Sequence, residues 1–318
     1  MKIFAQTPSR ISLMGGGTDL EPFSREYGGI VLSLAINLRQ NVILRTEDDL
    51  WEKHISLPSD ADPQLAYTIL DQFGINSMHH SVLESSFDGI MGAGLGSSGS
   101  FSVALIGAIF KSKAYEIDRA LIAETAYDIE VNKLGWVGGR QDQIAAANGG
   151  LNAIRFDKKG SSIVNLDRNL AEKLCSYLLL VYTGGVRQSR KIQSNYKSLT
   201  EQQLSSLKRM KTYAEIALSH ITFGNPDFVM VGNIMDFAYQ LKKESNRGVA
   251  TPKIDEVYDL GKKLGAIGGK VLGAGGGGYM LFFVDPIKRE TVVKGLAKKG
   301  VEEVDFAPDF TGLDVRRL

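Results

Sequence analysis

Residues 98–113 place the strongest constraint on the fold, because they predict a helix that is apolar nearly all round. A helix with apolar side chains on every side has to be buried on every side, so this one must lie at the centre of a domain. The glycine-rich segment Gly92–Ser100 leads directly into it. With 318 residues the chain is too long for one ordinary core, and we expect two domains of roughly 150 residues each.

The rest of the pattern alternates strands and helices. Segments 28–36 and 41–46 are rich in β-branched residues and predict strands, and Asp118 is a suitable N-cap for a second helix. In the second half we expect a strand at 176–182, then a helix that begins at Thr200 with Gln203 in a capping box, and then a helix that begins at Asn225 with Pro226 in its first turn. Strands at 269–273 and 279–284, a helix at 286–298 and a strand at 301–306 should follow. This order predicts an α+β fold in which helices cover one face of an antiparallel sheet, with domains at 1–170 and 171–318.

The composition excludes several classes of function. Lys and Arg (37) nearly balance Asp and Glu (36), so no overall field attracts nucleic acid or an anionic membrane, and we expect neither as a partner. A bound anion must therefore be held by a local site. The single cysteine, Cys175, excludes an internal disulfide, and no apolar run approaches the roughly 20 residues that span a bilayer. The first ten residues lack the apolar stretch of a signal peptide, so a cytoplasmic location is expected.

Three glycine-rich segments carry the chemistry: Pro8–Leu20, Gly92–Ser100 and Lys270–Tyr279. In the second, glycines allow the backbone to approach an anion, and the helix that follows points free N–H groups and a positive dipole end at it. Ser97 and Ser98 add hydroxyls for phosphate oxygens or a hard cation. A tight strand-to-helix turn with serine caps is the alternative, and the loop alone leaves both interpretations open.

Two better-known nucleotide motifs are excluded. Gly94–Gly99 and Gly273–Gly278 both match the spacing of the dinucleotide fingerprint. The first has no convincing βαβ unit downstream, and the second runs into a strand rather than a helix. Ser100 stands where a P-loop requires its lysine. The chain therefore contains neither a Rossmann site nor a P-loop of the Walker type.

The three segments, in this order, resemble the GHMP kinases, a family of small-molecule kinases that use ATP and Mg²⁺. The resemblance spans Pro8 to Tyr279. It implies an α+β fold with two domains, a ribosomal S5-like N-terminal domain and a ferredoxin-like C-terminal domain, with the active site in the cleft between them. It also implies that the second segment wraps the triphosphate of ATP through Gly92, Gly94, Leu95, Gly96, Ser97, Ser98, Gly99 and Ser100.

The resemblance also implies roles for individual side chains. Glu130, together with Ser98, would hold Mg²⁺, and Asp142, twelve residues further on, would face the acceptor hydroxyl. Arg10 would contact Asp142, and Asp19 would bind sugar hydroxyls. Without the resemblance, Glu130 reads as an exposed helix carboxylate, Asp142 as a helix cap and Arg10 as a surface residue. The remaining expected substrate contacts are Gly17, Thr18, Gly275 and Gly276.

Two segments indicate a branch of the family. Gly15–Leu20 is similar to the heptose 7-phosphate kinases and the kinase domains of L-fucokinases rather than to galactokinases. Thr183–Ser189 also resembles the heptose kinases, which implies that Thr183 and Arg187 hold a phosphate; for Arg187 an ion pair with a surface acid is the alternative. The segment Phe87–Met91 lacks the proline that often precedes the family's phosphate loop. We expect a sugar-phosphate 1-kinase; a free-sugar 1-kinase and an inactive ATP- and sugar-binding sensor stay open, and the oligomeric state is not predicted.

Overall fold

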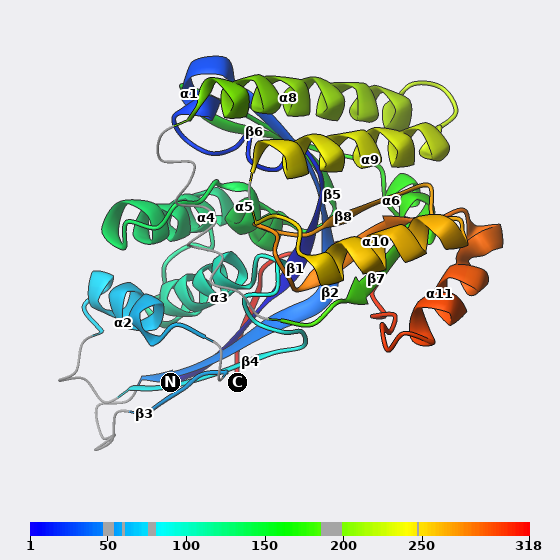
Figure 1. Ribbon diagram of the computed structural model, residues 1–318. Helices are drawn as coiled ribbons and strands as arrows, with labels where there is room; N and C mark the ends of the chain where they lie inside the picture. Colours follow the sequence, from blue (N-terminus) through cyan, green and yellow to red (C-terminus); the bar gives the residue numbers. More distant parts are fainter. Residues whose placement is uncertain (47–53, 59–60, 76–80, 186–198, 247) are drawn as a thin grey trace.

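A computed structural model describes residues 1–46, 54–58, 61–75, 81–185, 199–246 and 248–318. Two sheets organise these residues (Figure 1). The larger sheet is made of β1 (Lys2–Met14), β2 (Gly29–Thr46), β3 (His54–Ser56), β4 (Ser81–Phe87), β5 (Leu151–Asp157), β6 (Gly160–Asn165) and β10 (Asp314–Arg317). The smaller sheet is made of β7 (Leu178–Tyr182), β8 (Gly268–Val271) and β9 (Tyr279–Phe283).

The long strand β2 pairs with three other strands of the larger sheet. The two strands predicted at 28–36 and 41–46 are one continuous strand of 18 residues. Its first part pairs with β5, its last part pairs with β4, and β1 runs along its other edge, all antiparallel. The register of β1 shifts at Pro8/Ser9, where proline has no N–H to donate. The shift lies two residues before Arg10, whose side chain is buried.

Helix α3 (Ser97–Ser112) is the predicted apolar helix, and it is buried on nearly every side. It packs on β1 and β2. The helices around it are α2 (Pro63–Gln72), α4 (Arg119–Asp128), a π-helix (Ile129–Lys133) and α5 (Gln141–Asn148). The predicted cap is confirmed, because the Asp118 carboxylate accepts hydrogen bonds from the N–H groups of Ala120 and Leu121. This arrangement fixes the N-terminus of α3 against the middle of β1, where Thr7 and Pro8 contact Ser100.

The second half of the chain contributes the helices that lie around the smaller sheet and over part of β1 and β2 of the larger one. They are α6 (Arg168–Ser176), α8 (Glu201–Thr222), α9 (Phe228–Ser245), α10 (Pro252–Leu264), a 3₁₀ turn (Pro286–Lys288) and α11 (Arg289–Ala297), while the short α1 (Phe23–Tyr27) lies beside α8. The predicted capping box of Thr200 and Gln203 is present. The predicted start of the next helix is wrong, because Asp227 is the N-cap of α9 and Pro226 precedes it.

The strand predicted at 301–306 is also wrong. This segment makes a single bridge to β7, between Glu303 and Val181. The chain then crosses to the larger sheet, where the Ala307 carbonyl accepts a hydrogen bond from the Asn37 N–H. The segment therefore forms no continuous ladder with either sheet. The chain ends instead in β10, which pairs with β1. Residue 170 lies within α6, and a division of the chain there stays a prediction.

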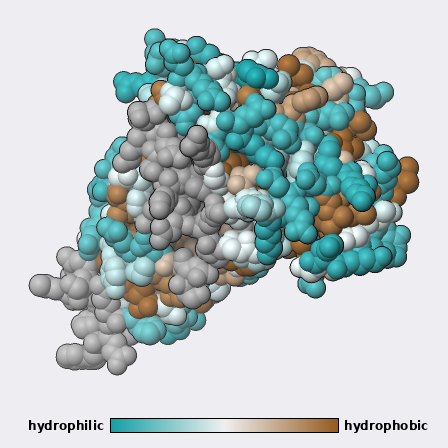
Figure 2. Space-filling view, viewed as in Figure 1, coloured by the Kyte–Doolittle hydropathy of each residue, from teal (hydrophilic) through white to brown (hydrophobic). Residues whose placement is uncertain are grey.

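The face in Figure 2 is largely hydrophilic. Apolar side chains gather at its upper right, over the junction of α8 and α9, where Phe223, Val229 and Met230 are exposed. Among the described residues no helix is both long and apolar enough to cross a bilayer.

Candidate active site

A cavity of about 770 Å³ lies where the two sheets and their helices meet. All three glycine-rich segments contribute to its wall. The predicted site residues that line it are Arg10, Gly17, Asp19, Gly92, Gly94, Gly96, Ser97, Ser98, Glu130 and Asp142. Residues more than 130 positions apart in the sequence therefore face one space.

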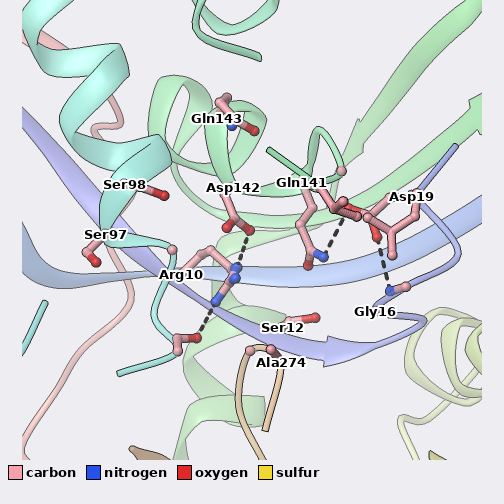
Figure 3. A pocket seen from close by; sticks show the side chains of 18 of the residues that line it. Arg10, Ser12, Gly16, Asp19, Ser97, Ser98, Gln141, Asp142, Gln143 and Ala274 are labelled. Carbon is pink, nitrogen blue, oxygen red and sulfur yellow. Dashed lines mark hydrogen bonds and ion pairs between the residues drawn. The ribbon is translucent and has the colours of Figure 1, made fainter. Parts of the chain in front are cut away.

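Arg10 and Asp142 form an ion pair at the centre of the cavity. The Nε of Arg10 donates to Oδ1 of Asp142 at 2.7 Å, and a terminal nitrogen of Arg10 donates to the Gly94 carbonyl at 2.7 Å. Arg10 is 5% exposed, so it is not a surface residue. Asp142 lies in the first turn of α5 and makes no cap hydrogen bond. In Figure 3 the pair lies between Ser97 and Ser98 on one side and Asp19 and Gln141 on the other.

Asp19 is a buried carboxylate that the loop after β1 holds in place. Its Oδ1 accepts from the Gly17 N–H at 3.1 Å and its Oδ2 from the Gln141 side chain at 3.0 Å. Burial, followed by the negative charge of Asp142, raises the pKa of Asp19. Thr18 does not line the cavity; its hydroxyl lies 2.8 Å from the Gly15 carbonyl and accepts from the Ile30 N–H at 3.1 Å. A carboxylate so placed can accept hydrogen bonds from the hydroxyls of a ligand.

Replacement of Gly139 is expected to disturb Asp19 selectively. A Cβ at this position would lie 1.8 Å from Oδ2 of Asp19. Gly139→Ala should therefore displace the carboxylate and raise KM for the phosphoryl acceptor about tenfold or more, with KM for ATP unchanged. The matched control is Gly138→Ala, where the nearest atom to the new Cβ is 3.9 Å away. Equal acceptor KM values in the two variants would contradict a substrate role for Asp19.

The loop before α3 is built to expose backbone N–H groups. Gly96 is the N-cap of α3 in the left-handed conformation (φ 72°), and a Cβ there would lie 3.1 Å from the Asp142 carboxyl carbon. Gly94 packs against the glycine turn after β8, where a Cβ would lie 2.8 Å from the Leu272 carbonyl. The loop thus contacts both the ion pair and the second glycine-rich turn, and the first N–H groups of α3 are left for an anion.

The serines of this loop differ in what they contact. The Ser97 hydroxyl accepts from the Gly92 N–H at 3.1 Å and closes the loop. The Ser100 hydroxyl donates to the Pro8 carbonyl at 2.6 Å, and Leu95 is buried among apolar residues. Leu95, Gly99 and Ser100 do not line the cavity, so their part in binding the nucleotide stays a prediction. Ser98 does line it and faces Glu130.

Glu130 lies in the π-helix that follows α4 and is 6% exposed, so the alternative of an exposed carboxylate is wrong. The Ser102 hydroxyl donates to its Oε1 at 2.8 Å, and the Ser98 hydroxyl lies 3.4 Å from its Oε2. Burial is the main cause that raises the pKa of Glu130 from its ordinary value of 4.5 to about 7, and the charge of Asp142 adds to it. A buried carboxylate beside a hydroxyl offers hard oxygen ligands that a divalent cation would neutralise.

These donors fit Mg²⁺ better than a metal that needs several protein ligands. The described residues contain no cluster of three or more His, Cys, Asp or Glu side chains that could hold a metal. Mg²⁺ is usually bound through one or two carboxylates together with substrate phosphates and water. One carboxylate (Glu130) and one hydroxyl (Ser98) beside a phosphate-binding loop suit that pattern.

Two lysines that were not predicted as site residues also line the cavity. Lys242 comes from α9 and Lys270 from β8. Lys242 donates to the Gly273 carbonyl at 2.8 Å, and Lys270 donates to the carbonyls of Ser12 at 2.7 Å and Leu13 at 3.3 Å. The sequence signal for Lys270 was weak: it is the charged residue of an otherwise uncharged strand that leads into the third glycine-rich segment.

An apolar part of the cavity wall was also not predicted from the sequence. Leu65, Phe101 and Trp136 line the cavity together with Ser97 and Ser98. Leu65 and Phe101 belong to the core around α3, and Trp136 packs against that core. Such a surface beside a phosphate-binding loop is suited to a flat heterocycle, because apolar and aromatic side chains dominate ligand pockets.

Several predicted substrate contacts lie elsewhere. The Thr183 hydroxyl is buried and donates to the Gly278 carbonyl at 2.8 Å. The Gly276 N–H donates to the Val249 carbonyl at 2.6 Å, and Gly275 packs against the same residue. These three residues do not line the cavity, and their contact with substrate stays a prediction. Arg187 lies outside the described residues.

A glycine-rich loop at a helix N-terminus, an Arg–Asp ion pair and further buried carboxylates therefore face one cavity. The GHMP kinase N-terminal domain matches residues 64–150, and the GHMP kinase C-terminal domain matches residues 217–302. A D-glycero-alpha-D-manno-heptose 7-phosphate kinase of Campylobacter jejuni is 30% identical, over 99% of each chain. The chain therefore belongs to the GHMP kinase family and is a phosphotransferase with an alcohol group as acceptor.

Further relatives agree with this assignment. A bifunctional fucokinase/GDP-fucose pyrophosphorylase of Arabidopsis thaliana is 25% identical over 95% of this chain, which spans 31% of that protein. The crystal structure of a putative sugar kinase from Campylobacter jejuni superposes with a TM-score of 0.77 at 28% identity, covering 100% of this chain and 98% of that one. A heptose 1-phosphate kinase from Bacteroides thetaiotaomicron has the same fold, with a TM-score of 0.79 at 22% identity over 99% of each chain.

Proposed function

We propose that this protein is an ATP- and Mg²⁺-dependent kinase that phosphorylates the anomeric hydroxyl of D-glycero-D-manno-heptose 7-phosphate to give the 1,7-bisphosphate. The observation that carries the proposal is the position of the Arg10–Asp142 pair, between the phosphate-binding loop and Asp19. The similarity over the whole chain to a heptose 7-phosphate kinase supports the choice of acceptor. A cytoplasmic location belongs to the same proposal.

The loop Gly92–Ser98 and the N-terminus of α3 bind the phosphates of ATP. The free N–H groups and the helix dipole favour an anion there, and the apolar wall of Leu65, Phe101 and Trp136 receives the base. Glu130 and Ser98 would hold Mg²⁺, which supplies positive charge against the phosphates when bound. Ser102 orients the Glu130 carboxylate through its hydrogen bond of 2.8 Å.

Asp142 acts on the acceptor. Its carboxylate accepts the proton of the attacking hydroxyl as the acceptor oxygen bonds to the γ-phosphorus and the bond from that phosphorus to the bridging oxygen of ADP breaks. Arg10 fixes the orientation of Asp142, because one of its nitrogens donates to the Gly94 carbonyl while another donates to Oδ1 of Asp142. Asp19 and Gln141 fix the sugar hydroxyls on the far side of the pair. The chain thereby contributes positioning and charge, which phosphoryl transfer mainly requires.

A second candidate acceptor is a free sugar such as L-fucose. The similarity to the bifunctional fucokinase, which extends over 95% of this chain, favours it. The two candidates differ in charge as well as in the sugar, since fucose carries no phosphate. An inactive sensor is disfavoured because Arg10, Asp142 and Glu130 are all present and face the cavity.

A direct comparison of acceptors tests the proposal. We expect kcat/KM for heptose 7-phosphate to exceed that for L-fucose, galactose and mannose by at least about tenfold, because the phosphate adds charge-assisted hydrogen bonds. Phosphorus NMR of the product should show the new phosphate on the anomeric oxygen. If an unphosphorylated sugar is preferred tenfold, the choice of acceptor is wrong and the kinase assignment stands.

A further inference from the structure

Lys242 and Lys270 are two ammonium groups in the cavity that the transfer step does not use. Within the described part of the chain neither forms an ion pair with a carboxylate. Lys270 is 8% exposed, and its donors reach only the Ser12 and Leu13 carbonyls among these residues. Lys242 uses one of its three donors on the Gly273 carbonyl. Buried ammonium groups are ordinarily paired, so this arrangement is unusual.

The two lysines also lie close to a third cation. Burial, followed by the positive charges of Lys242 and Arg10, holds the pKa of Lys270 well below its usual range. Burial, followed by the charge of Arg10, lowers the pKa of Lys242 to about 8, while Asp19 acts in the opposite direction. Arg10 is itself neutralised by Asp142. Lys242 and Lys270 are therefore the basic groups of this cluster that lack a carboxylate ion pair among the described residues, and an anion placed between them would favour their charged forms.

The cluster lies on the acceptor side of the cavity. Lys270 binds the carbonyls of Ser12 and Leu13, which lead directly into the turn that carries Asp19. Figure 3 places Ser12 and Ala274 on the side of Arg10 away from Ser98. Glu130, which would hold the cation of the nucleotide, contacts Ser98 and Ser102 on the opposite side of Asp142. Lys270 thus lies on the far side of the Arg10–Asp142 pair from Ser98 and Glu130, while Lys242 binds the carbonyl of Gly273, in the turn that packs against Gly94.

We propose that Lys242 and Lys270 form the anion-binding end of the acceptor subsite and bind the phosphate group of a phosphorylated acceptor. The inference rests on the proposed function and deepens it, since it assigns the group that separates a sugar phosphate from a free sugar. Lysine suits this role as a compact charge with several donors. The open donors of Lys242 and the remaining donor of Lys270 are available for phosphate oxygens.

The first test measures binding of inorganic phosphate. It uses the full chain saturated with a non-hydrolysable ATP analogue and Mg²⁺, so that the phosphate-binding loop is already occupied. We expect the wild-type protein to bind phosphate in calorimetric titrations, and Lys242→Met to weaken this binding at least about tenfold. Lys242→Arg should retain most of it. Lys270 also ties β8 to β1, so the test uses Lys242, whose removal leaves that tie intact.

The matched control is Lys243→Met. Lys243 is the next residue of α9, and its ammonium pairs with Asp255 outside the cavity. This variant should bind phosphate as the wild-type protein does. If the protein with the analogue bound takes no phosphate, or if Lys242→Met binds it normally, the inference is wrong.

A kinetic test separates this inference from the choice of acceptor. In Lys242→Met, the ratio of kcat/KM for heptose 7-phosphate to kcat/KM for unphosphorylated heptose should fall at least about tenfold. An equal loss with both acceptors would mean that the lysine acts on the transferred phosphoryl group, and would overturn the inference. If heptose 7-phosphate is no substrate but phosphate still binds through Lys242, the proposed acceptor fails and the anion site stands.

Discussion

Asp142→Asn is expected to lower kcat by at least about 100-fold while ATP affinity stays near that of the wild-type protein. Asparagine keeps the shape of the side chain and still presents an oxygen to Nε of Arg10, 2.7 Å away in the wild-type ion pair. It cannot take the proton of the acceptor hydroxyl, and it removes the charge that neutralises Arg10. Steady-state kinetics together with a nucleotide-binding titration would measure both effects.

The control for this variant is Asp118→Asn. Asp118 caps α4 outside the cavity, and asparagine is an equally good cap, so both turnover and stability should be unchanged. Turnover of Asp142→Asn near the wild-type rate would remove Asp142 from the catalytic step. A loss of ATP affinity equal to the loss of kcat would instead indicate that the substitution distorts the loop at Gly94 through Arg10.

Glu130→Gln is expected to raise the Mg²⁺ concentration for half-maximal rate at least about tenfold. The substitution replaces a charged oxygen ligand of a hard cation with a neutral amide. Ser98→Ala should act in the same direction and more weakly, because its hydroxyl is a neutral ligand. Titrating Mg²⁺ at saturating ATP and acceptor measures the effect, and Glu116→Gln, an exposed site away from the cavity, is the control.

Glu130→Gln should also be more stable than the wild-type protein when Mg²⁺ is absent. The pKa of Glu130 is raised from 4.5 to about 7, so between these pH values the unfolded chain releases the proton first. The stability of the folded state therefore falls as pH rises through this window, by on the order of 3 kcal/mol. Glutamine lacks this penalty. Thermal unfolding in chelator should show an advantage for Glu130→Gln that is large at pH 8 and shrinks toward pH 4.5.

Local patterns predicted the parts of the site whose signal lies within a short segment. The helix at 98–113 is buried because its sequence leaves it no polar face, and the caps at Asp118 and Thr200 are set by residues three positions away. The spacing of Glu130 and Asp142 had no meaning without a family resemblance. Glu130 and Asp142 face one cavity because α4 and α5 pack around α3, and no periodicity in the sequence predicts that packing.

Neither the two cavity lysines nor β10 was predicted from the sequence, because their partners are remote in the chain. Lys270 meets carbonyls that lie 257 and 258 positions earlier in the chain. The segment 301–306 has the composition of a strand, yet it crosses between the two sheets: Val304 donates to the Leu180 carbonyl, and Ala307, just beyond the segment, accepts from the Asn37 N–H. Composition reports the preference of a segment, whereas the availability of a free strand edge decides whether it pairs.

The pairing of β10 with β1 has a consequence for the order of folding during synthesis. β1 leaves the ribosome first, but Asp314–Arg317, which complete its outer edge, emerge about three hundred residues later. Until then β1 presents an unpaired row of N–H and C=O groups, and Gly107 on α3 lacks the Leu313 and Val315 side chains that cover it. The strand that carries Arg10 is therefore an open edge in the nascent chain, where pairing with another copy competes with closure of the native sheet.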